Sequence, residues 1–445
     1  MNGFLGQVFT VLFGRGVIRI AQFVSLLILA RVLTPTEFGW FGIITTAIAL
    51  SAVLGSLGLR QSFSYQIGQG RLTPAEAVGT ALVLWPVLAA VAAMVVAVLY
   101  AGAVDGVDSG LMIALIAVGV SVTILHTLLQ GVFLGKGQIW AFSLSEAIPR
   151  IALMIGVAVL AALATLSLAT ALWVHVIGFA IALPVMVWLS LGASGQVRTA
   201  MSKVRSMLGY GLIFALNLFL VQLCARLSMF VIESVQGADA AGQFFAAVRV
   251  AEIFLESATA LGLVLFSRAS RESDTDSTIK RGVRVASGVF WLFLAVSVFV
   301  AICAPWVVSV LLGEAYSGAT IALQILALGL APMAASKIIY SSLAGAGRPH
   351  FGTPVLLSSL LINLTVAVLL VPPLGVAGGA IALVIGQYAL HAGYALTCRS
   401  RYGVALKEFV LPPVSLFRSI SLRVIFRRWW PRGGRDDRGD GGLQT

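Results

Sequence analysis

The stretch FGRGVIRIAQFVSLLILAR at residues 13–31 has a counterpart at residues 208–226, which reads LGYGLIFALNLFLVQLCAR. With a constant offset of 195 residues, identical residues fall on five positions of the first stretch: Gly14, Gly16, Ile18, Ala30 and Arg31. The correspondence continues at an offset of 203, where Gly39 falls on Gly242, and at 210, where the turn at 135–137 falls on 345–347. The sequence therefore predicts two structurally similar halves.

The composition identifies the class of protein. The chain has 445 residues, of which 59% are hydrophobic and 10% are charged, and its mean hydropathy is +1.01. A soluble core could not bury so much apolar surface, so we expect a polytopic membrane protein. Ten of the 29 Lys and Arg residues lie between Arg399 and Arg438, which predicts contact with membrane lipid and not with nucleic acid. Three widely spaced cysteines predict neither a disulfide framework nor a metal site.

Twelve apolar runs are long enough to cross a bilayer, six in each half. An even number of spans gives both halves the same orientation, and parallel repeats of this size are typical of secondary transporters. We expect lobes at 1–191 and 208–397, a cytoplasmic linker at 192–207 and a basic cytoplasmic tail at 398–445. The opening run carries arginines and continues into another span, so we expect it to be retained and not cleaved. The runs lie at 11–33, 38–59, 76–100, 111–134, 147–165, 168–191, 208–233, 242–267, 285–304, 319–340, 353–371 and 375–397.

The connections between these spans alternate in charge. Every second connection, beginning at 34–37, contains neither Lys nor Arg. Basic residues are found in cytoplasmic loops far more often than in outer ones, so both termini are expected in the cytoplasm. The basic connections contain Arg60, Arg71, Lys136, Arg198, Lys203, Arg205, Arg268, Arg271, Lys280, Arg281, Arg284 and Arg348.

Three charged residues within the eighth span share one helical face, because Arg249, Glu252 and Glu256 are three and four residues apart. A charge at the centre of a membrane helix costs about 3 kcal/mol, so this face is expected to point inward. One interpretation is a structural ion pair between Arg249 and Glu252, which leaves Glu256 without a partner. The other is that Glu252 and Glu256 bind a coupling proton or sodium ion.

Further cations lie in the spans and predict an anion-binding cavity. Arg15 and Arg19 would lie in its inner half with Arg150 and Lys337, unless the last two extend to lipid head groups. The outer half would hold Arg31, Arg226 and Arg249. Guanidinium groups bind phosphate in a bidentate manner, so pyrophosphate is the expected ligand of Arg15, Arg19, Arg31, Arg226 and Arg249. The sequence has no nucleotide-binding or metal-binding motif, and we expect no cofactor.

Several segments resemble one known family in their order along the chain. They are ILARVLTPTEFG at 28–39, GLRQS at 58–62, LFSR at 265–268 and AGAGRP at 344–349. They resemble the Wzx-type polysaccharide flippases of the multidrug/oligosaccharidyl-lipid/polysaccharide exporter superfamily, up to about Thr397. The resemblance implies two six-helix lobes around a cavity that alternates its opening. It also implies export of a polyprenyl-pyrophosphate-linked oligosaccharide across a bacterial plasma membrane, alongside other polysaccharide-assembly proteins.

Two other classes remain open at this point. An ion-coupled drug or metabolite exporter of the same superfamily would have more carboxylates than arginines in its cavity. A membrane polysaccharide polymerase or ligase would have a long outer loop with polar catalytic residues, whereas the longest outer connection, at 305–318, has about fourteen residues. The sequence therefore favours a flippase that is not an enzyme.

Overall fold

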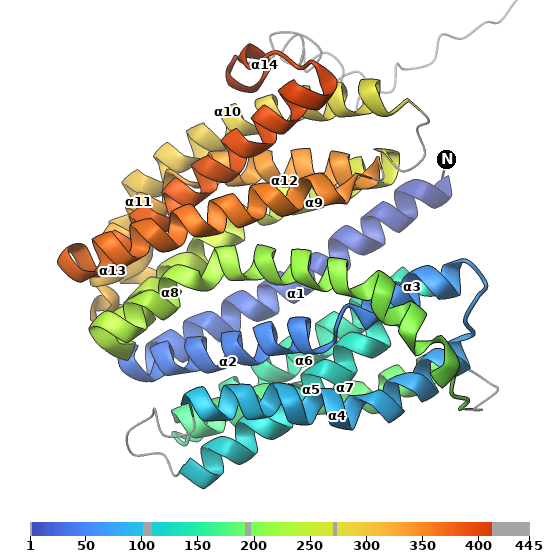
Figure 1. Ribbon diagram of the computed structural model, residues 1–445. Coiled ribbons are helices and arrows are strands. Elements are labelled where there is room, and N and C mark those ends of the chain that lie inside the picture. Colours follow the sequence, from blue (N-terminus) through green and yellow to red (C-terminus); the bar gives the residue numbers. More distant parts are fainter. Residues whose placement is uncertain (1, 101–108, 192–196, 270–273, 347, 412–445) are drawn as a thin grey trace, which may run out of the picture.

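The computed structural model describes residues 2–100, 109–191, 197–269, 274–346 and 348–411, and these residues form helices and no strands. Figure 1 shows an N-terminal lobe, a C-terminal lobe, and α8 running between them. The N-terminal lobe contains α1 (Asn2–Val32), α2 (Pro35–Gly55), α3 (Leu59–Gly68), α4 (Pro74–Tyr100), α5 (Ser109–Gly135), α6 (Ile139–Ala162) and α7 (Leu168–Leu191). The C-terminal lobe contains α8 (Val204–Phe254), α9 (Glu256–Ala269), α10 (Thr275–Val307), α11 (Gly318–Ala327), α12 (Leu330–Gly345), α13 (Gly352–Tyr402) and α14 (Lys407–Val410).

The long helices confirm a multi-pass membrane protein with the predicted twelve-span arrangement. Among the described residues, eight helices are long and apolar enough to cross a membrane, or nine if α11 and α12, bent by 49°, form one span. Two of the eight fold back on themselves, α8 at Gly237 (φ 81°) and α13 at Gly375 (φ 58°). Glycine adopts these positive φ angles without steric cost. The helix α13 therefore contains two of the predicted spans, whereas α8 contains the span at 208–233 and the first half of the span at 242–267, which α9 continues.

Side chains at the helix starts explain where two of the spans begin. Thr34 and Glu37 form a capping box at the start of α2, and Thr73 and Glu76 exchange the same pair of hydrogen bonds at the start of α4. Both helices also begin at a proline, whose fixed φ suits the first helical turn. The two Thr-Pro-x-Glu segments therefore end the preceding connections and set the depth of the spans that follow.

The two lobes meet along α2 and α8, where glycines permit close approach. Gly39 and Gly242 lie opposite each other: a Cβ on Gly39 would lie 2.0 Å from the carbonyl oxygen of Ala238, and one on Gly242 would lie 2.0 Å from that of Pro35. These two glycines occupy equivalent positions in the internal repeat. The repeat therefore supplies both sides of the interlobe contact.

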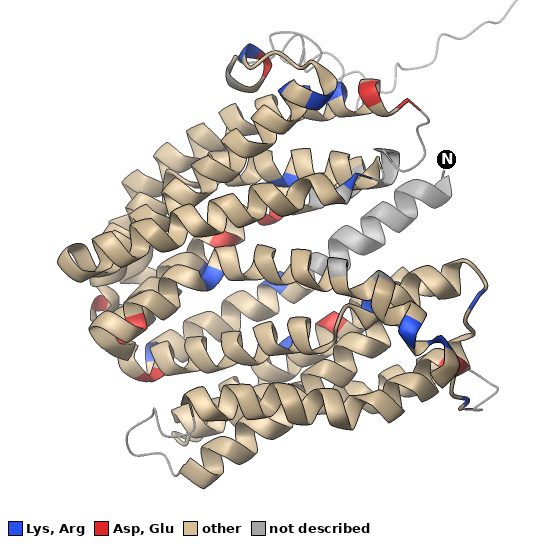
Figure 2. Cartoon of the chain, in the orientation of Figure 1, with Lys and Arg blue, Asp and Glu red and all other residues tan. Residues whose placement is uncertain are grey.

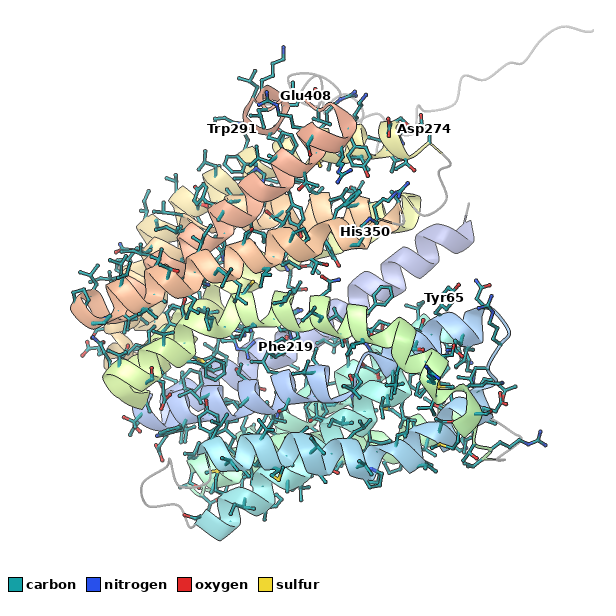
Figure 3. All side chains as sticks on the ribbon, viewed as in Figure 1. Tyr65, Phe219, Asp274, Trp291, His350 and Glu408 are labelled. Carbon is teal, nitrogen blue, oxygen red and sulfur yellow. The ribbon has the colours of Figure 1, made fainter. Side chains whose placement is uncertain are left out.

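Charged residues gather at the helix ends, with a small group in the middle of the molecule between the lobes (Figure 2). Figure 3 shows the side chains that cover the lobes, with Tyr65, Asp274 and Glu408 lying toward the ends of their helices. The charges between the lobes are the exception to this pattern. Because charges at membrane depth are costly, they mark the candidate site.

Candidate functional site

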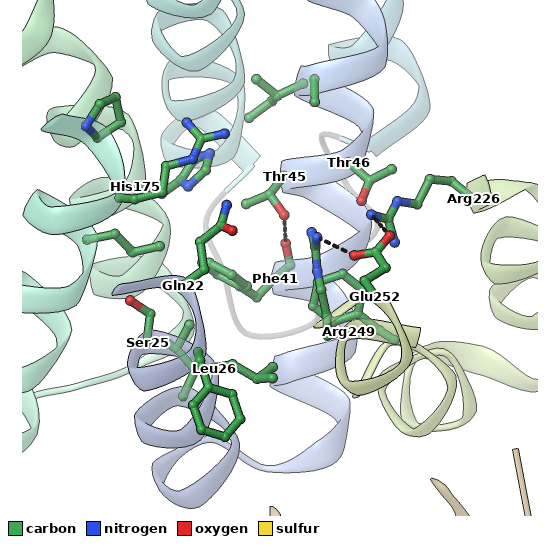
Figure 4. Close-up of a pocket in the computed structure, with 18 of the residues that line it drawn as sticks. Gln22, Ser25, Leu26, Phe41, Thr45, Thr46, His175, Arg226, Arg249 and Glu252 are labelled. Atoms are coloured by element: carbon green, nitrogen blue, oxygen red, sulfur yellow. Dashed lines mark hydrogen bonds and ion pairs between the residues drawn. The ribbon is translucent and has the colours of Figure 1, made fainter. Parts of the chain in front are cut away.

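A cavity of about 280 Å³ lies between the two lobes (Figure 4). Residues of α1, α2, α5, α6 and α7 line it from the N-terminal lobe, and residues of α8 line it from the C-terminal lobe. Its lining contains four arginines, which we call the arginine quartet: Arg19, Arg150, Arg226 and Arg249. Glu252 is the one carboxylate in this lining, so the described walls of the cavity carry an excess of positive charge.

The fold-back of α8 brings two of these arginines to the same depth. Arg226 precedes Gly237 by eleven residues and Arg249 follows it by twelve. At a rise of 1.5 Å per residue, they lie about 16 and about 18 Å along their helices from the turn. Side chains that are 23 residues apart in sequence therefore face one cavity.

Glu252 joins these two arginines. Its Oε1 accepts a hydrogen bond from Nη2 of Arg226 at 2.6 Å, and its Oε2 accepts one from Nη1 of Arg249 at 3.1 Å. The predicted ion pair between Arg249 and Glu252 is therefore present, and it includes a third residue from the preceding half of α8. Figure 4 shows the three side chains meeting at the cavity wall.

Glu256, which the ion-pair interpretation left without a partner, has one in the other lobe. It forms an ion pair with Arg19 of α1, whose Nη1 also donates a hydrogen bond to Oε1 of Gln22 at 2.7 Å. The side chain of Arg19 is 39% exposed. One residue of the quartet thus contributes both to an interlobe contact and to the cavity surface.

Aromatic rings lie beneath two guanidinium groups of the quartet. Arg150 lies over Phe179 at 5.4 Å from the ring centroid, and Arg249 lies over Phe245 at 4.7 Å. Such cation–π contacts hold a guanidinium group while leaving its N–H donors at the edge of the plane. The aromatic rings therefore orient two cations without using all of their hydrogen-bonding capacity.

The sequence predicts Arg150 either in the cavity or at the lipid head groups, and the structure shows it in the cavity lining. The predicted span began at residue 147, whereas α6 begins at Ile139, so Arg150 lies about three turns into the helix. The additional two turns were missed because Ser143, Ser145 and Glu146 lower the local hydropathy. The sequence signal that indicates the cavity position of Arg150 is a charged residue directly after a proline within a helix, as in Pro149–Arg150.

Arg31 lies outside the cavity lining. Its Nε donates to the carbonyl oxygen of Leu311 at 3.2 Å, and its Nη2 donates to that of Val310. Both acceptors belong to η3, a short π-helix at Val308–Leu312 whose last carbonyl groups lack continuing helix. Arg31 thus links the end of α1 to the C-terminal lobe. Arg15 belongs to α1 by its backbone, but its side chain falls outside the described residues.

Lys337 lines a second cavity of about 120 Å³ within the C-terminal lobe, where its Nζ donates to Oγ1 of Thr259 at 3.1 Å.

Within the described part of the chain, no group of three or more His, Cys, Asp or Glu residues could hold a metal ion. His126 is buried, and His175 lines the central cavity. Nε2 of His126 lies 2.9 Å from the carbonyl oxygen of Ser145, and His175 packs edge-on against Phe179.

Comparison with known proteins identifies the fold and the family. A family profile described as polysaccharide biosynthesis protein matches residues 28–321, more than half of the chain. An inward-facing multidrug resistance transporter of the MATE family superposes with a TM-score of 0.71 at 16% identity, over 88% of this chain and 96% of that one. The lipid II flippase MurJ, in an inward closed conformation, superposes with a TM-score of 0.67 at 12% identity, over 95% and 93%.

A sequence relative is also similar over a short segment. The uncharacterized membrane protein MJ1068 of Methanocaldococcus jannaschii is 32% identical over 84 residues, which are 19% of this chain and 17% of that protein.

Proposed function

Because the chain belongs to the Wzx-like polysaccharide biosynthesis family, whose fold is that of multidrug and flippase transporters, we propose that it translocates a polyprenyl-pyrophosphate-linked oligosaccharide. The observation that carries the proposal is the arginine quartet, drawn from both lobes around one cavity. Diphosphate oxygens accept paired hydrogen bonds from guanidinium groups, which matches four arginines better than any neutral cargo would.

The proposed mechanism uses the two lobes at 1–191 and 208–397 as rocking units. The diphosphate is bound by Arg19 and Arg150 of one lobe and by Arg226 and Arg249 of the other. The apolar outer surfaces of the lobes leave the polyprenyl tail in the bilayer while the sugar crosses through the cavity. Since cations of both lobes contact one ligand, release requires the lobes to separate.

The direction of transport follows from the proposed topology. With the basic connections in the cytoplasm of a bacterium, both termini are cytoplasmic, and the contact of Arg31 with η3 lies at the outer end of the cavity. The substrate would then be loaded from the inner leaflet of the plasma membrane and released into the outer one. Glu252 and Glu256 are the carboxylates at which a coupling proton or sodium ion would act.

The charge of the cavity favours a flippase over the alternative of a drug exporter. An exporter of organic cations needs carboxylates that outnumber arginines, whereas four arginines and one glutamate line this cavity within the described residues. An organic cation would be repelled by this lining. The proposed activity is transport and not catalysis, in keeping with the transporter fold.

Translocation in proteoliposomes tests the proposal. A fluorescent polyprenyl-diphosphate oligosaccharide is placed in both leaflets, and a membrane-impermeant quencher reports its movement, with and without an imposed proton gradient. We expect Arg226→Gln and Arg249→Gln to slow movement by about tenfold or more, because each removes a charged hydrogen bond of roughly 1.5–3 kcal/mol. Arg205→Gln, an exposed residue near the start of α8, is the matched control.

Wild-type rates in both cavity variants would refute the arginine-lined site. Efflux of a soluble compound without movement of the lipid-linked sugar would support the exporter instead. A rate that rises with the gradient in the wild type, but not in Glu252→Gln or Glu256→Gln, would support the coupling role of these carboxylates.

A further inference from the structure

Glu252 occupies the position between two arginines that an anionic ligand of the cavity requires. Its two oxygens accept hydrogen bonds from different guanidinium groups, at 2.6 Å from Arg226 and 3.1 Å from Arg249. A phosphate group bound between the same arginines would use the same donors. Two guanidinium groups this close would repel each other if no anion lay between them. Glu252 therefore acts as an internal counter-ion in this conformation.

Glu252 also borders a second cavity that contains a cation. It lines both the central cavity and the smaller cavity of about 120 Å³ in the C-terminal lobe. That smaller cavity is bordered by α8, α11, α12 and α13, and its lining contains Lys337, whose Nζ donates to Oγ1 of Thr259 at 3.1 Å. A glutamate side chain has three rotatable bonds, so its carboxylate can reorient from one cavity toward the other.

We propose that the substrate's diphosphate displaces Glu252 from Arg226 and Arg249, and that the displaced carboxylate turns into the smaller cavity toward Lys337. This inference rests on the proposed function, since it assumes that the quartet binds a diphosphate. In the exchange, the phosphate oxygens take over the donors of the two arginines, and the carboxylate gains the ammonium group. Each anion keeps a cationic partner, so no buried charge is left unpaired.

The proposal and a purely structural role predict opposite changes in diphosphate affinity when the charge of Glu252 is removed. If Glu252 only held the two arginines in place, removal of its charge would weaken binding of a diphosphate. If Glu252 competes with the ligand, removal of its charge strengthens binding. We expect Glu252→Gln to bind about tenfold more tightly, because the ligand no longer has to break a charged hydrogen-bonded pair. The same variant should translocate more slowly, since release from the arginines is no longer assisted.

The binding experiment uses the purified full chain in lipid nanodiscs and inorganic pyrophosphate as the probe, measured by isothermal titration calorimetry. Glu233→Gln is the matched control, because it removes the same charge from α8 at a position that lines neither cavity. Arg226→Gln reports whether the quartet binds the probe at all. Its loss of binding supports the proposed function independently of the result at Glu252.

Lys337 provides a second test that leaves the arginine pair untouched. We expect Lys337→Met to weaken pyrophosphate binding by about tenfold, because the displaced carboxylate then lacks its cationic partner. In the Glu252→Gln background, the same Lys337 substitution should have no effect. Such non-additivity identifies residues that act through one another.

Tighter binding in Glu252→Gln together with a non-additive Lys337 effect would establish the exchange. Unchanged or weaker binding in Glu252→Gln, with Arg226→Gln still impaired, would overturn it and leave the proposed function intact. A Lys337 effect of equal size in both backgrounds would also overturn it. Absence of saturable binding in every variant, the wild type included, would remove both proposals.

Discussion

The contact between Gly39 and Gly242 offers the sharpest test of how the lobes move. The proposed export by alternating access requires this contact to separate whenever the proposed outer end of the cavity opens. A Cβ on Gly39 would lie 2.0 Å from the carbonyl oxygen of Ala238 and 2.9 Å from the amide nitrogen of Gly242. Both near neighbours are backbone atoms, which cannot rotate away. Gly39→Ala therefore forces the two helices apart by roughly 1 Å.

The magnitude follows from the cost of overpacking, which is about 1–3 kcal/mol at a close contact. This cost applies only to the conformation in which the two helices touch. Since each 1.4 kcal/mol is a factor of ten, the population of that conformation should fall by roughly 5- to 150-fold relative to the open one. We expect Gly242→Ala to act in the same way, and the double variant to be less than additive, because one displacement relieves both clashes.

Spin-label distances provide the assay. With the native cysteines replaced by serine, labels are placed on the exposed residues Thr36 of α2 and Ser309 of η3, across the interlobe contact. We expect Gly39→Ala to move the distance distribution toward longer values. Gly16→Ala is the control, because a Cβ at Gly16 meets no atom within 4 Å. An unchanged distribution in Gly39→Ala, or an equal shift in Gly16→Ala, would refute the reasoning.

Three further variants test individual cations. Arg31→Met removes two hydrogen bonds to η3, worth together about 1 kcal/mol or more, so the separated population in the same spin-label experiment should rise about fivefold; no shift would contradict a latching role. Arg150→Lys keeps the charge but loses the planar fork, so pyrophosphate should bind about tenfold more weakly by calorimetry, and unchanged affinity would exclude a bidentate contact. The double variant Arg19→Glu with Glu256→Arg restores the ion pair in the opposite sense, so it should keep its thermal stability. It should nevertheless lose translocation, because a carboxylate then faces the proposed diphosphate, and normal translocation would reduce Arg19 to a structural role.

Much of the architecture could be predicted from the sequence because it depends on properties that act locally along the chain. Twelve apolar runs follow from the length needed to cross a bilayer, and the repeat relating Gly39 to Gly242 is visible as a constant offset. The inward orientation of Arg249, Glu252 and Glu256 follows from the cost of exposing a charge to lipid.

The partners of those charges were decided only by the tertiary structure. The sequence predicts equivalent roles for Arg31 and Arg226, since both end the repeated helix. In the structure, Arg226 donates a hydrogen bond to Glu252, whereas Arg31 donates to the backbone of η3. Glu256 forms an ion pair with Arg19 of the other lobe.

The reason is that an ion pair forms only when two side chains lie at the same depth in the membrane and point toward each other. Both properties are fixed by features that hydropathy does not measure. The fold-back at Gly237 sets Arg226 opposite Arg249, and the early start of α6 at Ile139 moves Arg150 from the membrane surface into the cavity. The sequence by itself determined that this membrane protein must bury its arginines. The packing of the two lobes determined which of them share one cavity, because each guanidinium group contacts whatever the neighbouring helix presents at its own depth.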